Sequence, residues 1–533
     1  DYGFMILDAG ELNGVKPNSV FQVTRQGKPI CKVRVIELEP GQSVVEIVEG
    51  SLGTGELVEV GDSVSLKPLE QTSITMTAKP EAPRAAISFP EILAANEPFS
   101  TFSLNVSDVS FKLAQASLAN HQLPESAKIR IEEFINAFDY GDPMPNADQR
   151  IACAHEQAAH PLFAGRNLLR ISMRTAEAGR SSQTPLRLTL LLDYSGSMDR
   201  ADRRESVRRA FALLARQLQA NDQITLIGFA REPRLLADRV NGAEAVSSLT
   251  NLVANHQSSG GTNLESALKL ALEKAQEQKL DGAQNRIVLL TDGAANLGDA
   301  QPDRLREVVE TMRTNGIAFD AAGVGADGLN DETLEALTRN GNGRYYFLNR
   351  PEDADDGFAK QIAGALRPAA MNVKVQVEFN PKRVGKYKLL GYEKHRLAKE
   401  DFRNDAVDAA ELAAAEAGVG IYQYEPLPDG EGDVGTVSVR FRDTSTGQMV
   451  ERRWPIPYDA SAPFINSASP SMRIAASAAL FAAKLKGDPL GESVELSELA
   501  SLIRQLPRNI RSIPRVQQLL AMIEQTQAIR GKQ

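Results

Sequence analysis

The sequence contains few residues of the kinds that mark disulfide-rich, membrane-spanning or histidine-rich metal proteins. Its 533 residues include two cysteines, one tryptophan and five histidines. Cys31 and Cys153 are too few for a disulfide scaffold, and we expect both to be buried thiols outside any disulfide. No run approaches about eighteen consecutive apolar residues, the length that a helix needs to span a bilayer. No transmembrane segment is therefore expected in this chain.

An excess of positive charge is also missing. Sixty Lys and Arg stand against sixty-nine Asp and Glu, which gives a formal net charge of −9. Proteins that wrap nucleic acid need clustered basic residues, so we expect no nucleic-acid partner. The hydrophobic and charged fractions, 42% and 24%, are those of ordinary globular protein. At about 150 residues per domain, the length predicts about three or four domains.

Composition and periodicity divide the chain into segments. Short β-rich runs separated by turn residues come first, and a proline-rich stretch follows them. A period of two returns after Pro368, and helical periodicity returns from Met472 onward. The expected order is a small β-barrel (1–68), a Pro-rich linker (69–98), an N-terminal extension of strands and helices (99–185), an α/β domain (186–367), a β-rich domain (368–460) and a helical C-terminal segment (461–533).

The central segment shows the pattern of a parallel sheet. Apolar runs such as Leu186 to Leu192 and Ile287 to Leu290 alternate with amphipathic stretches. Strands that are apolar throughout, separated by helices, indicate a sheet covered on both faces, so we expect a doubly wound, Rossmann-like α/β domain. The alternating segments on either side, including Leu168 to Met173 and Val373 to Phe379, are candidates to pair with each other. If they do, the α/β domain is an insertion in a β-sandwich-like frame.

Oxygen-bearing side chains follow the strands of this domain. Asp193, Ser195 and Ser197 come directly after the first strand, Thr262 follows a Gly-Gly pair, and Asp292 follows the apolar run that ends at Leu290. Ligands in open α/β sheets bind at the carboxyl ends of strands, so these loops are expected to meet. Carboxylates and hydroxyls without thiolate or imidazole favour magnesium, calcium or manganese over zinc or copper. Taken singly, Asp193 and Ser195 could instead cap the next helix, and Asp292 with Gly293 could form an ordinary turn.

The three motifs together resemble the metal-ion-dependent adhesion site (MIDAS) of von Willebrand factor type A (VWA) domains. The motifs are Asp193-x-Ser195-x-Ser197, the later Thr262, and Thr291-Asp292-Gly293, and they occur in the family's order. The resemblance implies that Ser195, Ser197 and Thr262 are direct ligands of a divalent cation, with Mg²⁺ first and Ca²⁺ or Mn²⁺ as alternatives. It also implies that Asp193 and Asp292 bind the cation directly or through water.

The flanking segments resemble a narrower group. The stretch from Asn96 to Val106, the stretch from Leu123 to Tyr140 and the motif Val375-Gln-Val-Glu-Phe-Asn-Pro381 are similar to parts of bacterial envelope-associated VWA proteins, many of them lipoproteins. That group carries a C-terminal domain of unknown function. The segment 1–68 is loosely similar to SH3-like barrels of bacterial envelope proteins. These resemblances imply a location in the cell envelope or outside the cell, either periplasmic or at the surface, with a tether expected upstream of Asp1.

The functional expectation is a binding module. The cation would receive an acidic side chain from a protein partner of unknown identity, as in adhesion. The alternative is a structural subunit of an envelope or extracellular assembly, in which the metal only stabilises the loops, and a homo-oligomer is left open. No catalytic residue is expected, because the sequence shows no general base near these loops, no GxSxG elbow and no phosphate-loop lysine. We therefore expect no enzymatic activity.

Two charged segments remain to be assigned. Arg203, Arg204, Arg208 and Arg209 are expected on the polar side of a helix, as a solvated face or, alternatively, as an anion-binding patch. The acidic, Ala-rich stretch from Glu400 to Glu416 is expected to be a solvated helix or loop.

Overall fold

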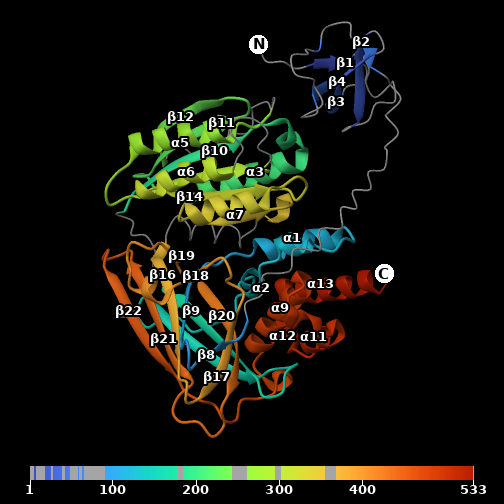
Figure 1. Cartoon of the computed structure of the whole chain (residues 1–533). Coiled ribbons are helices and arrows are strands. Elements are labelled where there is room, and N and C mark those ends of the chain that lie inside the picture. The colour runs from blue at the N-terminus through green and yellow to red at the C-terminus, as the bar shows by residue number, and fades with distance from the viewer. Residues whose placement is uncertain are drawn as a thin grey trace. The chain divides into compact units, whose positions relative to one another are not determined.

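The computed structural model describes residues 5–7, 19–25, 28–38, 43–47, 58, 63–64, 90–177, 184–242, 261–293, 302–353 and 368–531 (Figure 1). The chain divides into two compact units, Asp1–Arg84 and Ala85–Gln533. Within the described ranges, no helix has both the length and the apolar character needed to cross a membrane.

The first unit contains a five-stranded antiparallel sheet with the order β1-β4-β3-β2-β5. Its core comes from alternate residues of the strands, including Phe21, Val23, Cys31 and Val33. Closure of this sheet into an SH3-like barrel stays a prediction. The strands are β1 (Met5–Leu7), β2 (Val20–Arg25), β3 (Lys28–Leu38), β4 (Ser43–Ile47) and β5 (Ser63–Val64).

The second unit contains the α/β domain, whose six-stranded sheet has the order β12-β11-β10-β13-β14-β15. Neighbouring strands are parallel except β12, which is antiparallel to β11. The sequence pattern does not predict β12, because this half-exposed edge strand has no continuous apolar run. The strands are β10 (Leu186–Asp193), β11 (Gln223–Phe229), β12 (Pro233–Asn241), β13 (Gln284–Thr291), β14 (Ala318–Val324) and β15 (Tyr345–Leu348).

Helices cover both faces of this sheet. Successive strand residues point to opposite faces, and Leu190 and Leu191 accordingly belong to two different hydrophobic clusters. The cluster with Leu190 includes buried residues of α3, and the cluster with Leu191 includes buried residues of α5, α6 and α7. The structure thus has the doubly wound arrangement expected from the sequence. The helices are α3 (Ala201–Ala215), α5 (Leu264–Gln278), α6 (Pro302–Thr314) and α7 (Asp331–Asn340), with 3₁₀ turns η3 (Gly196–Asp199) and η4 (Pro351–Asp353).

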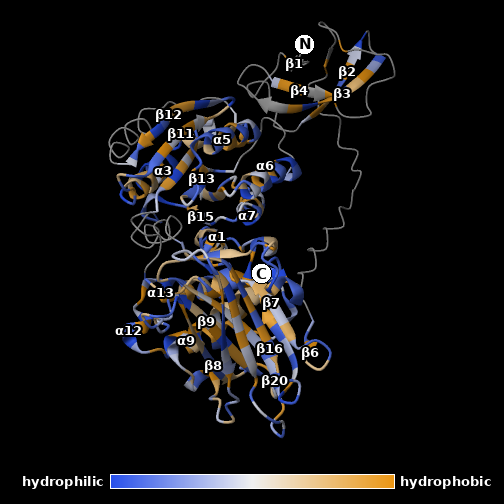
Figure 2. Ribbon diagram, turned by 90° about the vertical axis from the view of Figure 1, so that its left-hand side faces the viewer, coloured by the Kyte–Doolittle hydropathy of each residue, from blue (hydrophilic) through white to orange (hydrophobic). Residues whose placement is uncertain are grey.

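Two sheets on either side of a second core form a β-sandwich (Figures 1 and 2). One sheet has the order β18-β7-β16-β21-β22 with β19 beside β16, and the other has the order β6-β17-β20-β9-β8. The strands are β6 (Ile92–Leu93), β7 (Phe99–Ser103), β8 (Ile151–Ala159), β9 (Asn167–Thr175), β16 (Pro368–Phe379), β17 (Val384–Leu390), β18 (Arg396–Leu397), β19 (Ala410–Ala413), β20 (Ala417–Pro426), β21 (Gly435–Asp443) and β22 (Met449–Ile456).

Strands from before and after the α/β domain pair with each other in this sandwich. β7 pairs with β16, and β9 pairs with β20 along eight residues. The α/β domain is therefore inserted between β9 and β16. The structure changes one boundary, because Ile92–Leu93, assigned to the linker from its prolines, pairs with β17. The residues from 65 to 89 lie outside the described ranges.

A helical layer packs on the outer face of the sheet that contains β9 and β20. Its core joins Leu168, Val419 and Ile421 of that sheet to buried residues of α1, α2, α9, α11 and α13. The helices are α1 (Val109–Ala119), α2 (Ile131–Ile135), α9 (Pro470–Lys486), α10 (Pro489–Glu492), α11 (Leu496–Arg504), α12 (Arg508–Arg511) and α13 (Pro514–Arg530), with 3₁₀ turns η2 (Ser126–Lys128), η5 (Lys399–Phe402) and η6 (Ile465–Ser467).

Buried ion pairs connect the α/β domain to the sandwich. Arg286 of β13 is 1% exposed and contacts Asp320 of β14 at 2.8 and 3.0 Å and Glu411 of β19 at 2.8 Å. Arg344, just before β15, contacts Glu416. The expectation of a solvated stretch from Glu400 to Glu416 is therefore wrong at these two carboxylates. Their charge is neutralised by arginines that come from another segment of the chain.

Candidate metal site

The first and third motifs of the site meet because their strands are neighbours. β10 and β13 are parallel, with Leu192 opposite Leu290, so both strands end at the same edge of the sheet. The Thr291 hydroxyl donates a hydrogen bond of 2.5 Å to Oδ2 of Asp193. The backbone N–H of Ser195 donates to Oδ1 of the same carboxylate at 2.8 Å. Asp193 is thus held between the two strand ends.

The turn after β10 brings two hydroxyls beside this carboxylate. Oγ of Ser195 and Oγ of Ser197 are 3.1 Å apart. In this described turn, Ser195 occupies the N-cap position of η3 but its side chain makes no capping hydrogen bond, which argues against a purely capping role. Asp193 and Ser195 are buried, whereas Ser197 is exposed. The site is therefore open to solvent on the side of Ser197.

Arg203 of α3 connects Asp292 to the same turn. Its Nη1 donates to Oδ2 of Asp292 and to the backbone oxygen of Ser197, the latter at 3.1 Å. Asp292 itself is 1% exposed. Hydrogen bonds from Ser195 and Thr291, together with one arginine from the following helix, therefore bring Asp193, Ser195, Ser197 and Asp292 together.

Thr262 is placed at the same edge by the backbone that follows it. The N–H of Asn263 donates to the backbone oxygen of Ala230 at 2.8 Å, directly after β11. The N–H of Tyr194 donates to the oxygen of Phe229, also at 2.8 Å, and β11 is the other neighbour of β10. Thr262 is buried, with 1% of its surface exposed. The preceding residues 258–260 lie outside the described ranges.

Gly293 is required by the turn that follows Asp292. Its φ is +76°, a region that side chains disfavour, and a Cβ there would lie 2.9 Å from the backbone nitrogen of Asn330. Asn330 is the N-cap of α7 and accepts a hydrogen bond from the N–H of Thr333. The glycine of the Thr-Asp-Gly motif thus permits close packing between the site turn and α7.

The electrostatics of the site favour an added cation. Burial raises the pKa of Asp193 to about 6, and the negative charge of Asp292 acts in the same direction, against the hydrogen bonds from Ser195 and Thr291. A divalent cation would favour the ionised carboxylate. The described residues contain no cluster of three or more His, Cys, Asp or Glu able to hold a metal. Cation binding here would depend on the hydroxyls as well, and this oxygen-only set fits Mg²⁺, Ca²⁺ or Mn²⁺.

The arginines of α3 do not form the single solvated face expected from the sequence. Arg204, Arg208 and Arg209 are exposed and pair with nearby acidic residues, Asp199 or Glu205. Arg203 is 5% exposed and belongs to the site. Arg203 is four residues before Val207, so helical spacing places it on the buried stripe of α3. This spacing does not show that Asp292 is its partner.

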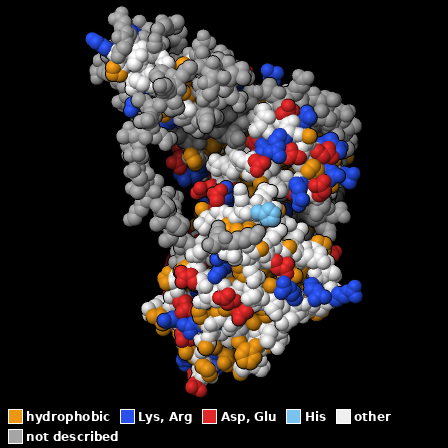
Figure 3. Space-filling model, turned by 90° about the vertical axis from the view of Figure 1, so that its right-hand side faces the viewer, with side chains coloured by type: hydrophobic (Ala, Val, Ile, Leu, Met, Phe, Trp, Pro, Cys, Tyr) orange, Lys and Arg blue, Asp and Glu red, His pale blue; other side chains and the backbone are white. Residues whose placement is uncertain are grey.

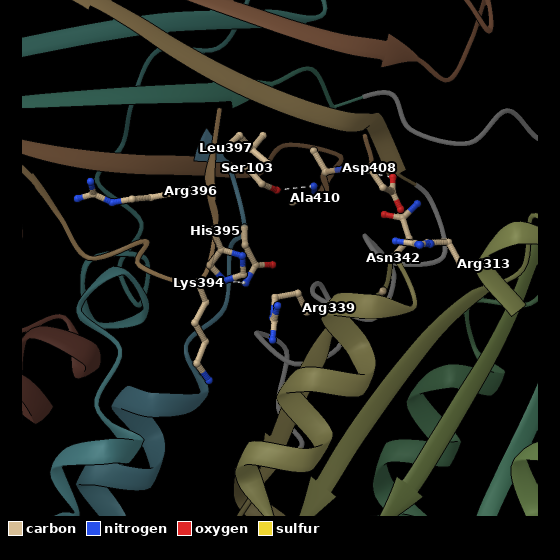
Figure 4. Close-up of a pocket in the computed structure, with 13 residues that line it drawn as sticks. Ser103, Arg313, Arg339, Asn342, Lys394, His395, Arg396, Leu397, Asp408 and Ala410 are labelled. Carbon is tan, nitrogen blue, oxygen red and sulfur yellow. Dashed lines mark hydrogen bonds between the residues drawn. The ribbon is translucent and has the colours of Figure 1, made fainter. Parts of the chain in front are cut away.

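A cavity of about 180 Å³ lies between the α/β domain and the sandwich (Figure 4). Its lining includes Arg313, Arg339, Lys394, His395 and Asp408. Burial lowers the pKa of His395 to about 4 and raises the pKa of Asp408. No sequence motif predicts a site here, because the lining residues come from segments that are far apart in the chain.

Comparison with known proteins agrees with this architecture. The model of the von Willebrand factor type A domain matches residues 188–360, a model described as von Willebrand factor matches residues 86–170, and the model of the YfbK C-terminal domain matches residues 364–432. The uncharacterized protein YfbK of Escherichia coli is 29% identical over 430 residues, covering 74% of this chain and 72% of YfbK.

More distant relatives share shorter segments. The uncharacterized protein sll0103 of Synechocystis is 28% identical over 40% of this chain and 49% of its own length. Human inter-alpha-trypsin inhibitor heavy chain H4 is 28% identical over 35% of this chain and 21% of its own length. Among solved structures, a von Willebrand factor type A protein from Catenulispora acidiphila covers 68% of this chain and 88% of its own, with a TM-score of 0.42 and 14% identity. The chain thus contains a von Willebrand factor type A domain and is homologous to YfbK, whose C-terminal domain it shares.

Proposed function

We propose that this chain is a metal-dependent protein-interaction module of the bacterial cell envelope. A divalent cation, Mg²⁺ in the first place, is held by Asp193, Ser195, Ser197, Thr262 and Asp292, and it receives an acidic side chain from a protein partner. VWA domains in general mediate protein–protein interaction or adhesion. The envelope location is part of the proposal and is supported by the resemblance of the flanking segments.

The observation that carries the proposal is the linked cluster at the carboxyl edge of the sheet. Asp193 and Asp292 are buried, yet they lie beside the exposed Ser197 and the hydroxyl of Ser195. Buried carboxylates are costly unless they are paired or bind a cation. Arg203 pairs with Asp292, whereas the hydrogen bonds to Asp193 come from neutral donors, the Thr291 hydroxyl and the Ser195 N–H. A site that combines buried carboxylates with an exposed hydroxyl is suited to hold a cation on one side and a partner on the other.

The carboxylates and the hydroxyls of the site would have different tasks in this module. Asp193 is oriented by the hydroxyl of Thr291 and the N–H of Ser195, so its carboxylate is fixed without the cation. The hydroxyls add oxygen ligands without adding negative charge. When bound, the cation supplies the positive charge that an acidic side chain recognises.

A titration tests whether the site binds a cation. Isothermal calorimetry with Mg²⁺ and electron paramagnetic resonance with Mn²⁺ should show one site in the full chain, and the double variant Asp193→Ala with Thr262→Ala should lose it. Asp199→Ala is the matched control, since Asp199 is an exposed acid of the same turn that pairs with Arg204. Equal cation binding by the double variant, with folding intact by circular dichroism, would refute the proposed site.

Crosslinking with mass spectrometry in envelope fractions tests the function itself. We expect crosslinks to a partner that disappear with EDTA and in the double variant but remain in Asp199→Ala. Crosslinks that persist unchanged under both conditions would instead support the alternative, a structural subunit in which the cation only stabilises the loops.

A further inference from the structure

Arg203 places a permanent positive charge inside the candidate metal site. Its guanidinium is buried, and Nη1 contacts Asp292 and the backbone oxygen of Ser197. Nη2 donates to the backbone oxygen of Asp327 at 2.5 Å. These contacts come from three separate loops. The arginine is therefore held in place from several directions at once.

The surrounding backbone makes room for this arginine. Gly325 has a φ of +76°, and a Cβ there would lie 2.9 Å from Nε of Arg203. Nε itself is buried and has no hydrogen-bond partner among the described residues. A buried donor without a partner weakens stability. The guanidinium is therefore placed where it bonds Asp292 and Ser197, although this position leaves its Nε–H without a partner among the described residues.

The charge count of the site shows what this arginine would change. Asp193 and Asp292 contribute two negative charges and Arg203 contributes one positive charge, so the protein part of the site carries a net charge of −1. A divalent cation brings the total to +1. Without Arg203, the same cation would be neutralised by the two carboxylates, and the loaded site would have little attraction for a further anion.

We infer that Arg203 is a built-in counter-charge that weakens the hold on the cation and strengthens the hold of the loaded site on a carboxylate. This inference rests on the proposed function, and it assigns to Arg203 a positioning and electrostatic role without direct coordination. It also identifies the partner group as an anion, since a single carboxylate brings the loaded site to neutrality. A neutral hydroxyl or amide would leave the positive charge in place.

The test measures two affinities of the full chain, one for Mn²⁺ and one for acetate. Mn²⁺ binding is followed by electron paramagnetic resonance, and acetate binding to the Mn²⁺-loaded protein by paramagnetic broadening of the acetate NMR signal. Arg203→Met keeps much of the side-chain length and removes the charge. We expect it to bind Mn²⁺ more tightly and acetate more weakly, each by on the order of tenfold.

Further variants separate charge from folding. Arg203→Lys keeps the positive charge, so its two affinities should stay near those of the wild type. The double variant Arg203→Met with Asp292→Asn removes one charge of each sign, leaves no unpaired carboxylate at Asp292, and keeps the loaded charge at +1. Because Asp292 is itself a proposed ligand, this double variant is compared with Asp292→Asn, which keeps Arg203 and has a loaded charge of +2. At saturating Mn²⁺, the double variant should bind acetate more weakly than Asp292→Asn, and this comparison holds even if Arg203→Met alone proves too unstable to measure.

The outcomes are distinct. Opposite changes of the two affinities in Arg203→Met, or weaker acetate binding by the double variant than by Asp292→Asn, support the inference. A parallel loss of both affinities in Arg203→Met, or equal acetate binding by the double variant and Asp292→Asn, overturns it and leaves the proposed function standing. Absence of Mn²⁺ binding by the wild-type chain overturns the proposed function itself.

Discussion

Glu335 offers a direct measure of the electrostatic contacts between the α/β domain and the sandwich. It lies on α7, is 5% exposed, and accepts hydrogen bonds from Lys394 at 2.8 Å and from Arg339 at 3.1 Å. Lys394 belongs to the loop between β17 and β18, and both it and Arg339 appear in Figure 4. Burial raises the pKa of Glu335, but the positive charges of Lys394 and Arg339 outweigh it and hold the pKa at about 2, below the ordinary 4.5.

The size and sign of the effect follow from this shift. A pKa lowered from 4.5 to about 2 corresponds to a contribution of about 3 kcal/mol to stability by linkage. Because Lys394 and Arg339 are 41% and 36% exposed, solvent screening reduces the expected value to about 2 kcal/mol. The folded-state pKa is depressed, so this contribution is complete above pH 4.5 and is lost as the pH falls toward 2.

The prediction is tested with Glu335→Gln in urea denaturation at pH 7, 5 and 3.5. The variant should be less stable by about 2 kcal/mol at pH 7, and the difference from wild type should shrink as the pH falls below 4.5. Glu332→Gln, an exposed glutamate on the same helix, is the control and should change stability by less than about 0.5 kcal/mol. A difference that is the same at pH 3.5 and pH 7 would refute the reasoning.

Three other perturbations have defined outcomes. Arg286→Met leaves two buried carboxylates without their arginine and should cost about 3–5 kcal/mol in chemical denaturation; a loss below about 1 kcal/mol would contradict the buried-pair argument. Gly293→Ala should lower the thermal midpoint more than Gly282→Ala, because both glycines have positive φ but only Gly293 meets backbone within 3 Å; equal shifts would count against that close contact. Mg²⁺ at about 100 times its dissociation constant should stabilise the wild type by about 2.7 kcal/mol and leave Asp193→Ala unchanged, as differential scanning fluorimetry can show. Stabilisation of both proteins alike would place the bound ion elsewhere.

Local pattern was sufficient to predict the strands that carry the site. The continuous apolar runs of β10 and β13 predicted buried parallel strands, and polar residues directly after them predicted that Asp193 and Asp292 would share an edge. The order of the motifs then identified the VWA domain, which the match over residues 188–360 supports. These features depend on residues close together in sequence, and sequence periodicity records them.

Contacts between distant segments were beyond the reach of such patterns. Arg203 looked like a member of a solvated arginine row, because its partner Asp292 lies 89 residues further along the chain. Glu411 looked like part of a solvated acidic stretch, because Arg286 lies 125 residues before it. Composition reports the charge of a segment, but the partner that neutralises a buried charge is fixed only when the chain folds.

The two ends of β13 carry different features of this domain. The buried ion pairs of Arg286 lie near its amino end, and the candidate metal site lies at its carboxyl end. Arg286 lies near the amino end and joins Asp320 and Glu411, whereas Asp292 directly follows the carboxyl end. Six residues of strand place these groups about 20 Å apart, beyond the separation of about 10 Å at which substitutions without shared partners usually act independently. Loss of the arginine at the supporting end should therefore lower the free energy of unfolding while leaving Mn²⁺ affinity within about twofold of wild type, measured below the denaturation midpoint. A large drop in Mn²⁺ affinity of folded Arg286→Met would show that the sandwich sets the geometry of the site through β13, and that the two ends of the strand do not act independently.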